Sequence, residues 1–164
     1  MITRIVHFSH IEMPLLKEQD RAALRDTFAE MTARVRIAFF QQAFDCETCG
    51  IVEQIVDEVA PLGEKIELVK HNFAIDRAAA EQYNIQRIPA MAITRLEATD
   101  AAETPGERDY GIRLYGVPSG YEFMSFIGAI LDVSAGDSQL SPESRALLAQ
   151  VQEPTHIQVF ATPT

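Results

Sequence analysis

Cysteine is almost absent from this chain of 164 residues, and its two occurrences, Cys46 and Cys49, lie three positions apart. So few cysteines exclude a small fold held together by several disulfide bonds. Hydrophobic residues make up 47% of the sequence, which is enough for an ordinary core. At this length we expect one domain, or one domain and part of a second.

Long hydrophobic runs are also missing. No stretch of about 18 apolar residues occurs, so we expect no membrane-spanning helix and no membrane partner. The first eight residues, Met1 to Phe8, lack the apolar stretch and the small-residue cleavage site of a signal peptide. We therefore expect a cytoplasmic protein, and in that compartment closely spaced cysteines are more often catalytic or metal-binding than structural.

Positive charge is the minority charge. The 14 basic residues face 24 acidic ones, which gives a net charge of −10. Because such a field repels a polyanion, we exclude nucleic acid as a partner. Part of the acidic excess lies in residues 96–109, where Pro105-Gly106 is also a turn signal, and we expect a solvated loop there.

From residue 34 onward the hydrophobic pattern predicts alternating strands and helices. A further helix is expected before them, at about residues 15–31. The order β-α-β-α-β-β-α is typical of an α/β domain in which helices surround a mixed sheet. Strands are expected over 34–40, 66–72, 87–94 and 110–115, and helices over 46–60, 76–83 and 119–131.

Three of the predicted helices begin with capping signals. Asp76 precedes the short third helix, and Ser119-x-x-Glu122 has the form of a capping box. Ser141-Pro142 combines a cap with a proline at the first helical position, which predicts one more helix near the C-terminus.

The sequence Cys46-Glu47-Thr48-Cys49 follows a buried strand and precedes an apolar pattern at helical spacing. The free N–H groups and the dipole of a helix N-terminus favour a thiolate on the first sulfur. The second sulfur lies one turn away and can close a disulfide, which is the geometry of a dithiol catalyst. Two alternatives are an inert cysteine pair and half of a zinc site. Zinc requires two more ligands, and the four histidines, His7, His10, His71 and His156, form no pair at ligand spacing.

The C-terminal region repeats the pattern that leads to Cys46. A linker at 136–138 is followed by the predicted helix and by an apolar strand at 156–160. We interpret this region as the start of a second, duplicated unit. When the chain is shifted by 120 residues, Ala29 aligns with Ala149, Met31 with Val151, Ile37 with Ile157, Phe39 with Val159 and Phe40 with Phe160.

Residues 44–49, the β-α-β pattern after them and Arg87-Ile88-Pro89-Ala90 resemble the thioredoxin/glutaredoxin superfamily. They resemble more closely the protein disulfide oxidoreductases of thermophilic archaea and bacteria, called glutaredoxin-like proteins. The resemblance implies a thioredoxin fold, a central mixed sheet flanked by helices, over residues 1–135 with an N-terminal helical extension. Residues 136–164 would be the linker, helix and strand of an incomplete second thioredoxin-like unit. The extra N-terminal stretch, the longer acidic loop and the missing second cysteine motif depart from the family.

The resemblance also assigns roles to four residues. Cys46 matches the nucleophilic cysteine and Cys49 the resolving cysteine. Pro89 matches the cis-proline that faces the disulfide, and Ile88 offers its backbone to an extended substrate segment. The buried acid found beneath the cysteines in the family is not evident, because Ala38 and its neighbours are apolar or aromatic.

We therefore expect a protein disulfide oxidoreductase that works by thiol–disulfide exchange, with no cofactor beyond the two cysteines and no metal. Its partners would be client proteins with disulfides or dithiols, and a thioredoxin-reductase-like flavoenzyme as electron donor. One alternative is the electron-shuttling N-terminal region of an alkyl hydroperoxide reductase flavoprotein. Another is a non-catalytic peptide-binding or assembly module of thioredoxin fold.

The predicted C-terminal strand lacks the rest of its unit, and an unpaired strand exposes backbone donors and acceptors. We expect this strand to pair with a second copy and form a homodimer, or the C-terminal segment to dock on the first unit. Docking would use Leu147, Leu148 and Val151. A third outcome is a C-terminal segment that stays frayed.

Overall fold

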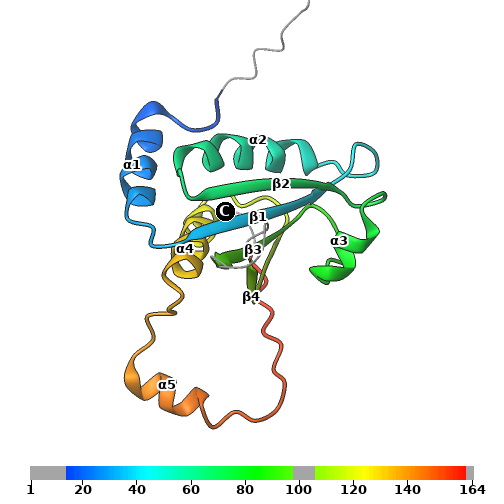
Figure 1. Cartoon of the computed structure of the whole chain (residues 1–164). Helices are drawn as coiled ribbons and strands as arrows, with labels where there is room; N and C mark the ends of the chain where they lie inside the picture. The colour runs from blue at the N-terminus through cyan, green and yellow to red at the C-terminus, as the bar shows by residue number, and fades with distance from the viewer. Residues whose placement is uncertain (1–13, 98–105, 162–164) are drawn as a thin grey trace, which may run out of the picture.

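The computed structural model describes residues 14–97 and 106–161, which form a four-stranded mixed sheet with helices around it (Figure 1). The strand order is β2-β1-β3-β4. β1 runs parallel to β2 and antiparallel to β3, and β4 is antiparallel to β3. The strands are β1 (Arg34–Gln41), β2 (Ile66–Asn72), β3 (Ala90–Glu97) and β4 (Gly106–Tyr115).

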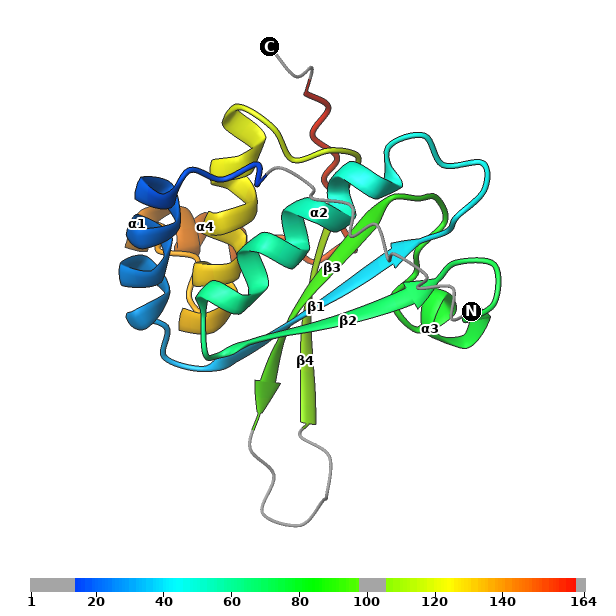
Figure 2. The same ribbon diagram turned by 90° about the horizontal axis from the view of Figure 1, so that it is seen from above.

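The larger core lies on the sheet face covered by α1 (Glu18–Ala29), α2 (Cys49–Val59) and α4 (Tyr121–Ala135), with a short 3-10 turn, η1 (Ala60–Leu62), after α2. Figure 2 shows α2 lying across the strands. The apolar spacing that predicted these helices is the stripe that each helix buries against the sheet. The fully buried side chains of this core include Ile37, Phe39, Val52, Val56, Ile93, Phe126 and Ile130.

The opposite sheet face is covered by the short helix α3 (Arg77–Gln82). Ala38 and Phe40 point to this face, while their neighbours Ile37 and Phe39 point to the larger core. Successive side chains of a strand alternate between faces, so β1 is buried on both sides. This burial explains why residues 34–40 appear in the sequence as a continuous apolar run.

Several boundaries differ from the sequence-based prediction. α1 is shorter than residues 15–31, and the helix after the cysteine motif begins at Cys49 rather than Cys46. β3 begins only after Pro89, which has no N–H to donate to the sheet. β3 and β4 extend into the expected loop at 96–109, so only residues 98–105 remain between them, and those lie outside the described residues.

Only one of the three predicted caps is confirmed. The hydroxyl of Ser141 accepts a hydrogen bond of 3.2 Å from the N–H of Ser144 at the start of α5 (Pro142–Leu148). Asp76 precedes α3, but its carboxylate accepts from the N–H of Asn72 at 2.6 Å instead of capping the helix. The capping box predicted at Ser119 is wrong, because the capping position of α4 is held by Gly120, which has no side chain that could cap the helix.

In the single chain the predicted strand at residues 156–160 does not form, and its pairing with a second copy stays a prediction. These residues belong to no strand, and Ile157, Val159 and Phe160 are 80–86% exposed. The predicted docking on the first unit is wrong, because Leu147, Leu148 and Val151 are 53–66% exposed. Figure 1 shows α5 standing apart from the sheet. A strand forms only where another strand satisfies its backbone groups, and none of the four described strands pairs with this segment.

No helix in the described parts of the chain is long and apolar enough to cross a membrane.

Candidate active site

The cysteine motif lies at the edge of the sheet where β1 and β2 end. These strands are parallel and their last residues, Gln41 and Asn72, are paired, so both carboxyl ends meet at this edge. The N–H of Phe73 donates to the carbonyl of Gln41 at 2.9 Å and holds the two departing loops together. Residues 42–48 connect β1 to α2 here and carry Cys46 (Figure 1).

Cys46 and Cys49 form a disulfide with an S–S distance of 1.98 Å and a Cα–Cα distance of 5.4 Å. The two cysteines differ in accessibility. Cys49 is the first residue of α2 and is only 3% exposed, whereas Cys46 lies in the preceding turn and is partly exposed. A molecule in solution therefore reaches the sulfur of Cys46 more readily than that of Cys49.

Opposing electrostatic influences act on Cys46. The N-terminus of α2 favours a thiolate, and the first turn of this helix contains no acidic residue. The exposed carboxylates of Asp45 and Glu47, on either side of Cys46, disfavour it. Asp45 has a φ of +56°, a left-handed conformation that aspartate tolerates better than most residues, so the chain turns sharply just before Cys46.

The peptide bond between Ile88 and Pro89 is cis, which confirms the expectation based on the family resemblance. Ala90 pairs with Phe40 in the sheet, so Pro89 and Ile88 lie just beyond the end of β1, at the edge that carries the cysteine loop. Pro89 is buried and its carbonyl accepts from the N–H of Gly116 at 3.1 Å. The structure therefore brings all four predicted site residues to one edge, while their roles in a reaction stay predictions.

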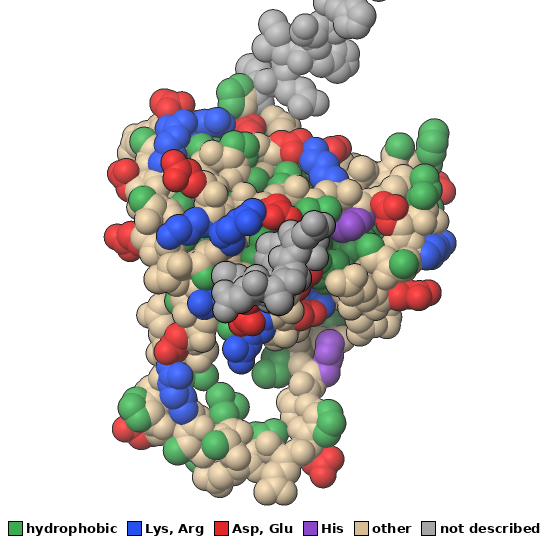
Figure 3. Space-filling model, viewed as in Figure 1, with side chains coloured by type: hydrophobic (Ala, Val, Ile, Leu, Met, Phe, Trp, Pro, Cys, Tyr) green, Lys and Arg blue, Asp and Glu red, His purple; other side chains and the backbone are tan. Residues whose placement is uncertain are grey.

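Exposed apolar side chains surround this edge. Phe44 is 83% exposed, Ile75, in the loop after β2, is 76% exposed, and Tyr121, the first residue of α4, is 86% exposed. Figure 3 shows hydrophobic side chains gathered over the loop that follows β1. The loops that carry Phe44 and Ile75 leave the paired ends of β1 and β2, and exposed apolar groups at one edge of a protein often contact other proteins. Sequence reasoning missed this apolar rim of Phe44, Ile75 and Tyr121, because two of its members come from separate loops and the third from the start of a helix.

Arg87 was also missed as a site residue. Its guanidinium carbon lies 4.5 Å from the centre of the Tyr115 ring, a cation–π contact. Tyr115 pairs with Ala90 across the sheet, so this contact is beside the Ile88–Pro89 segment. The nearest sequence signal was the motif Arg87-Ile88-Pro89-Ala90 itself, in which the arginine was given no role.

Among the described residues, no carboxylate is buried in the core beneath the sulfur of Cys49. The fully buried polar residues in the described ranges are Thr94 and Ser134 alone. His71 stacks on Phe40, with ring centres 4.8 Å apart, and burial lowers the pKa of its imidazole although the Asp76 carboxylate lies 3.9 Å away. Within residues 14–97 and 106–161, no group of three or more His, Cys, Asp or Glu side chains is arranged to hold a metal.

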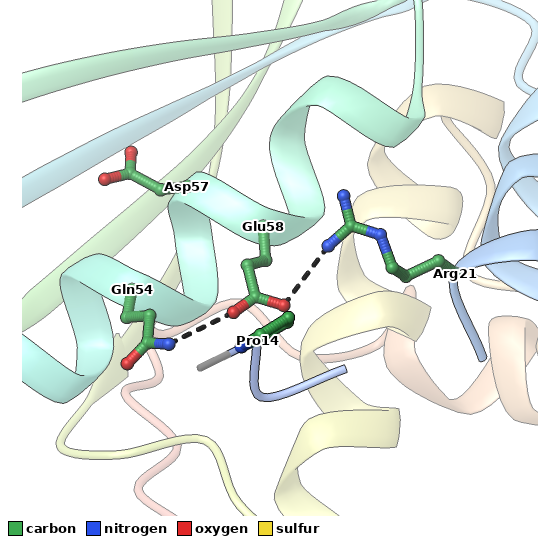
Figure 4. A pocket seen from close by; sticks show the side chains of 5 residues that line it. All are labelled: Pro14, Arg21, Gln54, Asp57 and Glu58. Atoms are coloured by element: carbon green, nitrogen blue, oxygen red, sulfur yellow. Dashed lines mark hydrogen bonds and ion pairs between the residues drawn. The ribbon is translucent and has the colours of Figure 1, made fainter. Parts of the chain in front are cut away.

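A shallow pocket lies elsewhere, on the outer side of α2 (Figure 4). The Glu58 carboxylate accepts the N–H groups of Leu15 and Leu16 at 2.8 and 3.0 Å, and it pairs with Arg21 at 3.2 Å. Glu58 lies nine positions after Cys49 on α2, about 13 Å along the helix. The pocket therefore reflects the attachment of the N-terminal segment to α2, not the cysteine site.

The arrangement of strands and helices in this chain is similar to that of known structures. A protein disulfide oxidoreductase from Aeropyrum pernix K1 superposes with a TM-score of 0.66 at 21% identity, over 82% of this chain and 54% of that one. The NTD_N/C domain of alkylhydroperoxide reductase AhpF from Enterococcus faecalis gives 0.66 at 26% identity, over 82% and 60%.

The chain has a thioredoxin fold. A C503A mutant of the E. faecalis AhpF subunit is similar to it as well, with a TM-score of 0.65 and 26% identity over 80% of this chain. This thioredoxin-fold chain spans only 54–60% of the length of these similar structures. No family model and no curated protein matches the sequence.

Proposed function

We propose that this chain is a thiol–disulfide oxidoreductase that acts on protein disulfides. The observation that carries the proposal is the unequal exposure of a cysteine pair placed at the start of α2, on the open edge of a thioredoxin fold. An accessible sulfur next to a buried one is the arrangement that exchange chemistry requires. The accessible sulfur meets the client, and the buried one reacts only within the chain.

In the reductive direction the Cys46 thiolate attacks one sulfur of a client disulfide. The client S–S bond breaks, its second sulfur leaves as a thiolate that takes up a proton, and a mixed disulfide links Cys46 to the client. Cys49 then loses its proton and attacks the Cys46 sulfur. This step forms the Cys46–Cys49 disulfide and releases the second client thiol, so two electrons pass to the client in total.

Ile88 and Pro89 would hold the client segment. Pro89 is buried and fixed to Gly116, while Ile88 is half-buried and next in the chain. We propose that the backbone of Ile88 pairs with an extended client strand and that the apolar rim, with Phe44 and Ile75, contacts the client around it.

The reaction needs no cofactor in this chain, but it needs a source of electrons. We propose a thioredoxin-reductase-like flavoenzyme as the donor, in a reducing cytoplasm. The similarity to AhpF supports a redox partner of this general kind, and an electron-shuttling region of such a flavoprotein is the second candidate. The two differ in electron donor, because the second candidate is reduced by a flavin domain of its own protein.

Reduction of insulin by dithiothreitol in the presence of the chain tests the proposal. We expect the wild type to accelerate precipitation of the insulin B chain and Cys46→Ser to abolish the acceleration. Cys49→Ser should instead accumulate a mixed disulfide with insulin, visible by non-reducing electrophoresis. If wild type and Cys46→Ser give equal rates, the chain is a non-catalytic binding module.

For residues 136–164 we propose self-association. Several apolar residues of α5 and of the segment after it remain exposed in the single chain, although the residues 120 positions before them are buried. Phe28, Ile37 and Phe39 are 0–2% exposed, whereas Leu148, Ile157 and Val159 are 53–86% exposed. Pairing of this segment with a second copy would cover them and make a homodimer.

A further inference from the structure

We propose that Arg87 is a specificity-determining residue that selects client segments with an aspartate or glutamate next to the attacked cysteine. The inference rests on the proposed function, since it concerns the segment held by Ile88. It goes further by naming the charge of the client and the atoms of this chain that recognise it.

The position of Arg87 places its side chain beside the client. Arg87 directly precedes Ile88, and the register between Phe40 and Ala90 puts this segment at the edge where the cysteine loop begins. The Arg87 side chain is exposed to solvent. A client strand paired with the backbone of Ile88 would therefore have side chains within reach of the guanidinium.

Tyr115 holds the guanidinium in a defined orientation. The guanidinium carbon lies 4.5 Å from the ring centre of Tyr115, and Tyr115 is itself fixed in β4 opposite Ala90. An arginine that stacks through its face leaves the N–H groups at its edge free to donate. Two such donors can bind one carboxylate, and a group already oriented loses less side-chain entropy on binding.

Two other arginines over tyrosine rings already have acidic partners. Arg108 lies 5.2 Å from the centre of the Tyr110 ring and 3.7 Å from the Glu97 carboxylate. Arg113, over Tyr83, is paired with Asp109 at 2.5 Å. Within residues 14–97 and 106–161, Arg87 has no carboxylate partner, so a client carboxylate would meet an unsatisfied cation.

The opposite side of the site has the opposite charge. Asp45 and Glu47 flank Cys46 and are both exposed. They repel an acidic client residue that lies on the Cys46 side, while Arg87 attracts one that lies on the Ile88 side. The charge preference should therefore depend on which neighbour of the client cysteine is acidic.

Four synthetic peptides test this proposal. Each contains one cysteine linked to 2-nitro-5-thiobenzoate, with glutamate or glutamine either just before or just after the cysteine. Attack by Cys46 on the peptide sulfur releases the coloured thiolate, so absorbance reports the rate constant of the first exchange step. The same peptides with serine in place of the cysteine report binding to the oxidised chain by fluorescence anisotropy.

We expect the reduced wild type to favour glutamate over glutamine up to about fivefold at one of the two positions and not at the other. Arg87→Gln should remove the preference, Arg87→Lys should keep part of it, and about 0.5 M salt should weaken it. Arg108→Gln is the matched control, because it removes the same charge from another arginine–tyrosine pair. Arg108 lies near the start of β4, away from Ile88, so this variant should keep the preference for glutamate. Arg77 lies over the ring of Phe73, and Arg77→Gln should also keep the preference for glutamate.

Equal rates and equal binding for all four peptides would overturn the proposal, and so would an equal loss of preference in Arg87→Gln and Arg108→Gln. If no peptide reacts faster with the chain than with free glutathione, the proposed function fails instead. In that case an Arg87-dependent preference in the binding measurement still supports the recognition of acidic segments.

Discussion

The hydroxyl of Tyr83, at the end of α3, donates a hydrogen bond of 2.6 Å to the carboxylate of Glu107 in β4. Thr94 of β3 donates to the same carboxylate at 2.5 Å and Arg36 of β1 at 2.9 Å. Glu107 thus links three strands and the helix on the second face of the sheet. Such a network stabilises the fold only while all its members are paired.

The hydroxyl of Tyr83 should ionise only at high pH. Burial and the neighbouring Glu107 raise the pKa of Tyr83 to about 12. This pKa is higher in the folded than in the unfolded chain. The contribution of Tyr83 to the free energy of unfolding is therefore fully present below about pH 10 and is lost as the pH rises toward 12. Ultraviolet titration of tyrosinate should show one late group that is missing in Tyr83→Phe. If the two titration curves coincide, the assignment is wrong.

Glu107→Gln should lower the free energy of unfolding by about 1–3 kcal/mol, because a neutral amide weakens the bonds to Arg36 and Tyr83 and orients only one acceptor. Urea denaturation monitored by circular dichroism measures this change. Glu97→Gln is the matched control, since Glu97 is half-exposed and its carboxylate lies 3.7 Å from Arg108. The control should change stability by less than about 0.5 kcal/mol, and equal losses would contradict the network.

Glu58 should make the attachment of the N-terminal segment depend on pH. Although burial opposes ionisation, hydrogen bonds from the N–H groups of Leu15 and Leu16 hold the pKa of Glu58 below its ordinary value. A lowered pKa in the folded chain means stability that is present above about pH 4.5 and is lost as pH falls below it.

Glu58→Gln should therefore remove about 1–2 kcal/mol at pH 7 and less at pH 4. Hydrogen exchange should become faster at the amides of residues 15 and 16, whereas the exposed Glu64→Gln leaves them protected. Unchanged exchange in Glu58→Gln would show that other contacts hold this segment.

Neutralising Asp45 or Glu47 should raise the reduction potential of the Cys46–Cys49 pair. Removal of a nearby negative charge stabilises the Cys46 thiolate, and with it the reduced form, by about 10 mV per exposed charge. We expect the wild type to lie near thioredoxin, at about −270 mV, rather than near −120 mV. Equilibration with glutathione followed by alkylation and mass spectrometry measures the potential. Glu81→Gln on α3 should leave it unchanged, and a wild-type value above about −180 mV would contradict this prediction.

Truncation after Gly136 should leave the thioredoxin-fold unit intact. Gly136 ends α4 with a φ of +70°, and the chain beyond it leaves the core. We expect the shortened chain to keep its insulin reductase activity and its melting temperature but to become monomeric in analytical ultracentrifugation. A full-length variant with Ile157, Val159 and Phe160 changed to serine should behave in the same way. A full-length monomer would show that the self-association proposal is wrong.

The sequence by itself determined the order of the elements and the place of the cysteines. Because β1 is buried on both faces, its sequence is a continuous apolar run, and residues 34–40 therefore predict a strand. Because α2 buries one stripe against the sheet, its apolar residues recur at helical spacing, and residues 51–59 therefore predict a helix. Two cysteines three positions apart at their junction can close a disulfide whatever surrounds them. The cis bond before Pro89 followed from the family resemblance and from no local pattern.

Only the tertiary structure decided which groups meet. Asp76 and Ser119 both have the residue types of helix caps. The carboxylate of Asp76 instead accepts the N–H of Asn72, and Ser119 does not hold the capping position of α4, because the loop before each helix sets which groups are within reach. The Arg87–Tyr115 contact joins residues 28 positions apart, and it depends on the register between β3 and β4. Residues 156–160 have a strand-like pattern but form no strand, because a strand is completed by hydrogen bonds to a neighbour, and a sequence pattern cannot supply that neighbour.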